Sequence, residues 1–115
     1  MDVISIDDLI VGVLRLYDAP ESQRSRIVRF LKSNPGLANT LLEAVPHLES
    51  VFGDAYRYLE LERDPYGWGE EIFCVVLVKG EPEQALELLH QFDEMWFSQK
   101  STNSDKLNFT VDTVE

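Results

Sequence analysis

The order of apolar and polar residues divides the chain into two parts at Gly53. Before it, apolar residues recur at intervals of three and four, as they do along one face of a helix. After it, they recur at every second residue over several stretches, which is typical of a strand with one buried face. The pattern predicts helices in residues 1–53 and a β-β-α-β unit in residues 54–115.

Start and stop signals predict three helices in the first part. Ser5 can cap the first helix, and Asp18 repeats the start signal for the second. Pro35 suits the first position of the third helix, and Gly53 ends it. Pro46 lies inside this third apolar stripe, so we expect a kink or a restart there.

The second part begins with a predicted hairpin. Residues 55–63 and 71–79 have strand character, and the DPYGWG segment between them is rich in turn-forming residues. Pro82 opens a fourth helix, and residues 107–112 alternate as a last strand with one wet face. We expect an α+β fold in which the amino-terminal helices pack on a small, mostly antiparallel sheet. Residues 1–115 are expected to form one domain with one core.

The strand at residues 72–78 is apolar on both faces, so both faces need cover. One face should contact the helix around Leu89, and the other the amino-terminal helices or a second subunit. We therefore predict a homodimer. The residues expected in the core or at the dimer interface are Val76, Val78, Trp68 and Trp96.

The charge is strongly negative and unevenly spread. The 115 residues include 21 acidic and 10 basic side chains, for a net charge of -11. Residues 54–115 hold fourteen of the acids and five of the bases, a net charge of -9. Nucleic acids and anionic bilayers are polyanions, so this charge opposes binding to either and favours a basic protein partner. The sequence has neither a signal peptide nor an apolar run of roughly 20 residues, so a cytoplasmic protein is expected.

The candidates for chemistry are few. The single cysteine, Cys74, lies in the middle of the apolar strand, where packing explains a thiol better than reactivity does. His47 and His90 have no further ligand at metal-binding spacing. Asp93 and Glu94 flank an aromatic residue on a helix, as solvated acids often do. We therefore predict no catalytic residue, no cofactor and no metal.

A helix-turn-helix that reads DNA is a possible alternative for the first part. The second helix, the SNPG turn and the third helix have suitable lengths, and the second helix is basic. The third helix would have to read the bases, however, and its LANTLLEAV segment contains no lysine or arginine. The arginines of the second helix are better explained by pairing with the acidic part of the chain or by exposure to water.

The acids around the hairpin are the main candidate site. If Arg63 pairs with Glu70, then Glu62 stands opposite Glu71, and like charges in that position destabilise a sheet. The predicted partner-binding residues on this face are Glu60, Glu62, Glu71, Tyr56 and Tyr58. Protection of an edge strand from aggregation explains the acids equally well. A dedicated calcium site would need an Asp-x-Asp-x-Asp-Gly pattern, which is absent.

Four stretches carry a family resemblance: LLEAVPHLESVFG, LELERDP, EEIFCVVLVKGEPEQALELLHQFDEMWF and LNFTVDTVE. Together they resemble a group of small acidic proteins in cyanobacterial genomes. The resemblance implies a protein of the antitoxin kind, encoded beside a nuclease or another toxin-like neighbour. It supplies no catalytic residues. The chain lacks the basic amino-terminal DNA-binding module of antitoxins that repress their own operon.

Two functions follow from these observations. The first is a non-enzymatic, cytoplasmic interaction protein, antitoxin-like or an adaptor, that masks a basic partner. The second is a small-molecule-binding or enzymatic α+β domain with a pocket between the sheet and the amino-terminal helices. Its lining would be Tyr56, Tyr58, Glu60 and Glu62. A pocket would make Glu60 and Glu62 concave and partly buried, whereas a docking face would leave them convex and wet.

Overall fold

A computed structural model describes residues 5–63, 66, 69–97 and 106–114, which form four helices and a three-stranded sheet. The α+β class is therefore confirmed. The helices are α1 (Ile6–Leu16), α2 (Arg24–Ser33), α3 (Pro35–Phe52) and α4 (Pro82–Phe97), and the strands are β1 (Arg57–Arg63), β2 (Glu70–Lys79) and β3 (Leu107–Val114). Within these ranges, no helix is long and apolar enough to cross a bilayer.

Several helix ends lie where the local signals predict them. The Ser5 hydroxyl accepts a hydrogen bond from the backbone N–H of Asp8 at 3.2 Å and so caps α1. Pro35 occupies the first turn of α3, and Gly53 ends that helix with a positive φ of 66°, which glycine adopts without strain. No restart occurs at Pro46, because α3 runs through it as one helix. Apolar side chains buried on both sides of Pro46 hold the helix against the core.

The predicted helix start at Asp18 is wrong, since α2 begins at Arg24. Asp18 instead forms an isolated bridge beside β1. Its backbone N–H donates to the carbonyl of Arg57 at 3.1 Å, and its carbonyl accepts from the N–H of Leu59 at 2.8 Å. These bonds between residues distant in sequence satisfy backbone groups that a capped helix would have satisfied locally.

Gln23 extends this cover along the edge of β1. Its side-chain oxygen accepts from the N–H of Leu61 at 3.0 Å, and its side-chain nitrogen donates to the carbonyl of Leu61 at 3.1 Å. The amide group thus makes the two bonds that a neighbouring strand would make. The segment between α1 and α2 therefore closes an edge that would otherwise be open to other chains.

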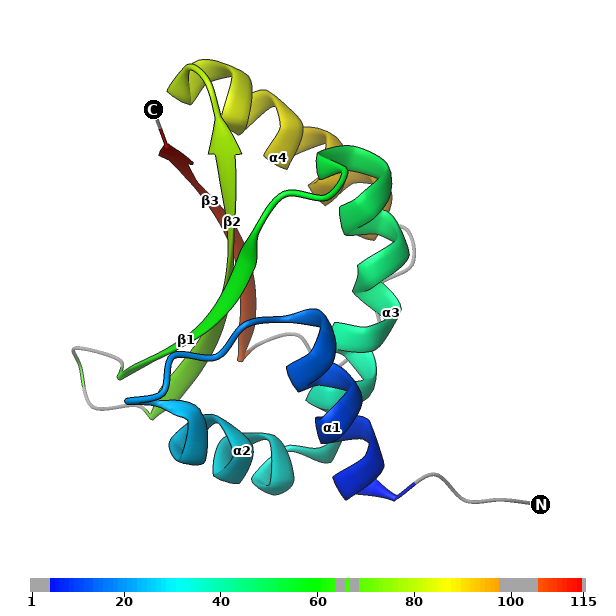
Figure 1. Ribbon diagram of the computed structural model, residues 1–115, viewed down its shortest axis with the longest axis vertical. Helices are drawn as coiled ribbons and strands as arrows, with labels where there is room; N and C mark the ends of the chain where they lie inside the picture. The colour runs from blue at the N-terminus through cyan, green and yellow to red at the C-terminus, as the bar shows by residue number, and fades with distance from the viewer. Residues whose placement is uncertain (1–4, 64–65, 67–68, 98–105, 115) are drawn as a thin grey trace.

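The sheet has the strand order β1-β2-β3 and is mixed (Figure 1). β1 and β2 form the predicted antiparallel hairpin, with Arg63 opposite Glu70 and Glu62 opposite Glu71. β3 pairs with β2 in parallel, which corrects the expectation of a mostly antiparallel sheet. The reason is α4, which returns the chain to the start of β2 so that β3 runs in the same direction.

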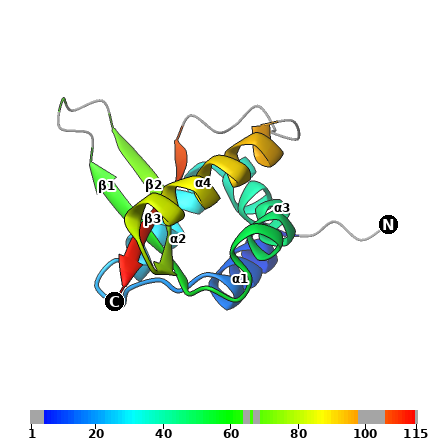
Figure 2. The same ribbon diagram turned by 90° about the horizontal axis from the view of Figure 1, so that it is seen from above.

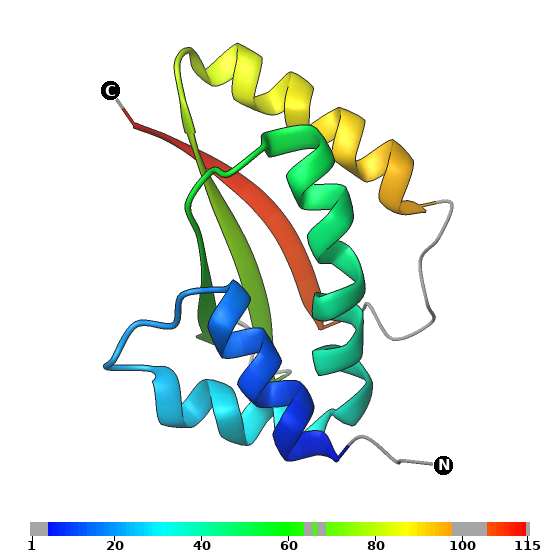
Figure 3. The same cartoon turned by 45° about the vertical axis from the view of Figure 1, so that its right-hand side comes forward.

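The helices all lie on one face of the sheet (Figure 1, Figure 3). Seen from above, α1 and α3 lie on one side of the molecule and the hairpin strands on the other (Figure 2). Side chains of α1, α2, α3 and α4 share one core with the inner face of the sheet. One of our alternatives placed the amino-terminal helices on the second face of β2. These helices lie on the same face as α4, so that alternative is wrong. The other alternative, a second subunit on the second face, stays a prediction.

Three of the four predicted core or interface residues are buried within the chain itself. Val76 and Val78 point into the core, with 2% and 8% of their surface exposed. Trp96 is 6% exposed and packs on the rings of Phe92 and Phe109, with centroids 5.9 and 5.7 Å away. Trp68 lies outside the described residues. Trp96 therefore no longer supplies a reason for a dimer.

Candidate functional site

The face of the sheet that points away from the helices is the candidate site, and we call it the outer face. Leu59 and Leu61 are buried in the core, so the alternation of a strand places the residues between and beside them on the opposite side. Register then extends this assignment to β2 and β3. The outer face comprises Tyr56, Tyr58, Glu60 and Glu62, then Glu71, Phe73, Val75, Leu77 and Lys79, and finally Asn108, Thr110, Asp112 and Val114.

An apolar row formed by Phe73, Val75 and Leu77 runs along the middle of the outer face. Val75 is only 6% exposed although no helix lies on it, because Tyr58 and Thr110 flank it in register. Phe73 and Leu77 are half-buried. None of the three belongs to the main core cluster. The centre of this face is therefore a second, smaller apolar surface.

Carboxylates surround the apolar row. Glu62 faces Glu71 in the predicted register, and Glu71 accepts a hydrogen bond from the side chain of Asn108 at 3.3 Å. Partial burial is the largest cause of the raised pKa of Tyr58, and the charges of Glu60 and Asp112 raise it further. None of these four carboxylates forms an ion pair with a lysine or arginine in the part of the chain that the structure describes.

Two tyrosines mark the other end of this face. The rings of Tyr56 and Tyr58 lie 6.0 Å apart. The hydroxyl of Tyr56 donates to the carboxylate of Asp18, and this bond is the main cause of its raised pKa. Both tyrosines therefore stay neutral near pH 7 and offer ring surface. The structure brings all five predicted partner-binding residues together on one open face.

The predicted pocket between the sheet and the amino-terminal helices is not lined by these residues. Tyr58, Glu60 and Glu62 point to the opposite side of the sheet, because the buried leucines of β1 take the helical side. Tyr56 does line a pocket of about 610 Å³, which lies at one end of the sheet beside Phe52 and Leu88 and is also lined by Asp54 and Lys79. The pocket contains no glutamate.

Of the remaining chemical candidates, Cys74 and His47 are part of the packing, whereas His90 and Asp93 are exposed on α4. Cys74 is fully buried, and burial raises the pKa of its thiol to about 12. His47 is half-buried with its ring against Trp96, at a centroid distance of 5.7 Å. Burial also raises the pKa of Asp93, and the charge of His90 opposes that rise. Over the described residues, no group of three or more His, Cys, Asp or Glu side chains could hold a metal ion.

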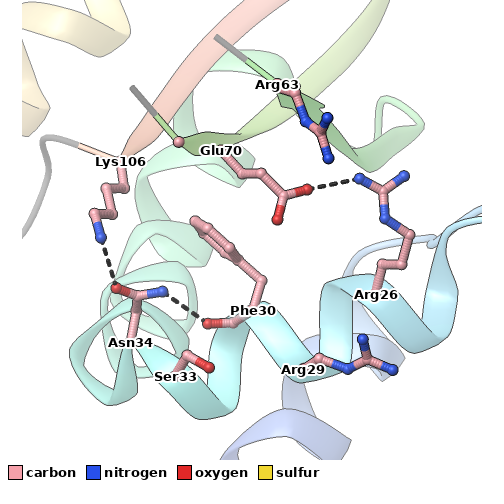
Figure 4. A pocket seen from close by; sticks show the side chains of 9 residues that line it. Arg26, Arg29, Phe30, Ser33, Asn34, Arg63, Glu70 and Lys106 are labelled. Carbon is pink, nitrogen blue, oxygen red and sulfur yellow. Dashed lines mark hydrogen bonds and ion pairs between the residues drawn. The ribbon is translucent and has the colours of Figure 1, made fainter. Parts of the chain in front are cut away.

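Sequence reasoning missed a second site, a pocket of about 570 Å³ between α2, the hairpin and the start of β3 (Figure 4). We call it the basic pocket. Its lining includes Arg26, Arg29, Arg63, Lys106, Glu70, Phe30 and Asn34. Arg26 pairs with Glu70 at 2.6 Å, which confirms that an arginine of α2 pairs with the acidic part of the chain. The basic second helix supplies Arg26 and Arg29, but no local signal showed that Arg63, Glu70 and Lys106 lie beside it.

Comparison of the chain with protein-family models, curated proteins and solved structures finds no match. The function is therefore inferred from the geometry of the protein's own residues.

Proposed function

We propose that this protein is a non-enzymatic interaction protein that binds a basic protein partner through its outer face. The observation that carries the proposal is an apolar row that none of the described helices covers, flanked by carboxylates that form no ion pair with a described lysine or arginine. The carboxylates are Glu60, Glu62, Glu71 and Asp112. An antitoxin-like or adaptor role, in which the protein masks its partner, fits this surface.

An apolar centre with a polar rim is the usual arrangement of a protein interface. Here Phe73, Val75 and Leu77 supply the centre and the acids supply the rim. Lysines or arginines of a partner would relieve the repulsion between Glu62 and Glu71, and the acidic field would speed their encounter. A second copy of the chain is a poorer occupant, because its own carboxylates would face these.

Reversing two charges tests the proposal. After a basic protein is captured from the native host and purified, its association rate is measured with wild type and with the Glu62→Lys, Glu71→Lys variant. We expect the variant to associate at least about tenfold more slowly at low salt and to lose most of its salt dependence. The matched control is Glu83→Lys, Glu87→Lys, which reverses two exposed acids on α4. This control should keep more of the wild-type association rate and more of its salt dependence than the Glu62→Lys, Glu71→Lys variant does.

If the Glu62→Lys, Glu71→Lys variant associates as fast as wild type at low salt, the acids of the outer face do not guide a partner. Their role would then be to keep the sheet from aggregating. The pocket beside Tyr56 is the alternative site for a small molecule. It has weaker support, since the paired glutamates that could provide acid and base chemistry lie elsewhere.

A further inference from the structure

We propose that the basic pocket binds a small phosphate-bearing anion. Figure 4 shows its side chains gathered from α2, from both arms of the hairpin and from the residue before β3. The basic helix α2 supplies two of its cations, Arg26 and Arg29, and the fold brings Arg63 and Lys106 to them. The pocket is concave and, at about 570 Å³, large enough for a small molecule.

The charge of the pocket is opposite to that of the protein. Four of the protein's 10 basic residues line it, namely Arg26, Arg29, Arg63 and Lys106. Among the described residues of the lining Glu70 is the one carboxylate, so this described lining has a formal net charge of +3 while the whole chain has -11. Four cations placed around one hollow repel each other, and a bound anion would offset that repulsion.

One of the cations, Lys106, already has a polar partner in the lining. The ammonium group of Lys106 lies 3.2 Å from the side-chain oxygen of Asn34, whose nitrogen donates to the carbonyl of Phe30 at 2.9 Å. Arg63 and Glu70 are opposite one another in the hairpin and point into the same space (Figure 4).

Glu70 already occupies part of the pocket as an anion. Its carboxylate contacts the guanidinium of Arg26 at 2.6 Å, and both side chains remain partly exposed. A phosphate group carries more charge and more acceptor oxygens than a carboxylate, and arginine binds it in the same forked manner. Phosphate could therefore displace Glu70 from Arg26 and also engage Arg63 and Lys106.

A small anion suits the pocket better than a long one does. A nucleic acid or an acidic peptide would extend past the pocket over a protein of net charge -11, which repels it. An anion confined within the hollow meets mainly the four cations. The pocket faces the helical side of the sheet, so a bound anion and the proposed partner on the outer face would occupy different sides of the sheet.

Titration of the purified protein with inorganic phosphate tests the site, by calorimetry and by backbone amide shifts in NMR at constant ionic strength in chloride. We expect saturable shifts at the residues that line the pocket. Arg63→Gln, Lys106→Gln should weaken phosphate binding by about tenfold or more. The control Arg15→Gln, Lys79→Gln removes the same charge elsewhere and should stay within about twofold of wild type.

Glu70→Gln should strengthen phosphate binding, whereas Arg63→Gln, Lys106→Gln should weaken it. Removing the internal carboxylate frees Arg26, so phosphate should bind several-fold more tightly than to wild type. The proposal is overturned if phosphate gives no saturable shifts, if both double variants weaken binding equally, or if Glu70→Gln weakens it. One further result would overturn the proposal. The protein would form a concentration-dependent dimer that the Arg63→Gln, Lys106→Gln variant abolishes, and phosphate would not bind. The pocket would then hold carboxylates of another copy of the chain. None of these results depends on finding a protein partner.

Discussion

At the scale of single residues, burial sets the chemistry of the polar groups inside the core. Tyr17 is 1% exposed, and its hydroxyl donates to the carbonyl of Leu41 at 2.6 Å. Burial is the main cause of its raised pKa, the nearby Cys74 adds to it, and Arg57 opposes it. The guanidinium of Arg57 lies 5.4 Å from the centre of the tyrosine ring. A hydrogen-bonded phenol is thus accommodated in the core without being ionised.

The pKa of Cys74 predicts how stability depends on pH. Folding raises this pKa from 9.0 to about 12, so the unfolded chain loses the thiol proton first as the pH rises. The resulting stabilisation is fully present below pH 9.0 and is lost progressively towards about pH 12. Urea unfolding between these pH values should show a falling free energy of unfolding. Cys74→Ala should make this fall smaller, and the part that remains should come from Tyr17, whose pKa burial also raises.

The same residue has a test at neutral pH. Alkylating reagents should leave Cys74 untouched until the protein unfolds, because the thiol is buried and protonated. Cys74→Ala should lower the free energy of unfolding by about 1–2 kcal/mol and leave partner binding unchanged. Rapid labelling of the folded protein would instead identify a reactive, accessible cysteine.

At the scale of elements, the side chain of Gln23 protects the edge of β1, because it makes the two backbone hydrogen bonds to Leu61 that a neighbouring strand would make. Gln23→Ala would leave both backbone groups of Leu61 without these bonds. We expect the free energy of unfolding to fall by about 1–3 kcal/mol and the protein to aggregate more readily, because the edge of β1 opens. Urea unfolding and light scattering measure the two effects.

Gln91→Ala is the control for this change, because Gln91 is an exposed glutamine on α4. It should change neither stability nor aggregation appreciably. Equal behaviour of the two variants would mean that water replaces the Gln23 amide without cost, and that the edge of β1 is protected by other means.

At the scale of the whole molecule, the two faces of the sheet differ in cover and in charge. The predicted homodimer remains a prediction, and the outer face is the surface through which it would form. Carboxylates of two copies would then face each other, so we expect dimerisation to strengthen as salt screens them. Light scattering at micromolar concentration and several salt concentrations measures this. A monomer of 13.2 kDa under all conditions contradicts the homodimer.

Local signals were enough for several helix ends and for the hairpin. The cap at Ser5, the proline at the start of α3 and the glycine at its end act within a few residues of themselves. The register that places Glu62 opposite Glu71 follows from the length of the turn. These features could be read from the sequence because each depends on backbone geometry over one or two turns of chain.

Only the tertiary structure decided the rest. Asp18 looked like a helix cap, but pairing with β1 satisfies its backbone instead. β3 became parallel because α4 returns the chain along the sheet, and the helices share one face because a single core buries more apolar surface than two small ones. The same non-local contacts bring Arg63 and Lys106 to α2. The alternation of β1 and the hairpin register predicted which residues share the outer face. Free energy of burial depends on the whole chain at once, and for that reason no local pattern predicted that the described helices leave this face uncovered, or that Arg63 and Lys106 lie beside α2.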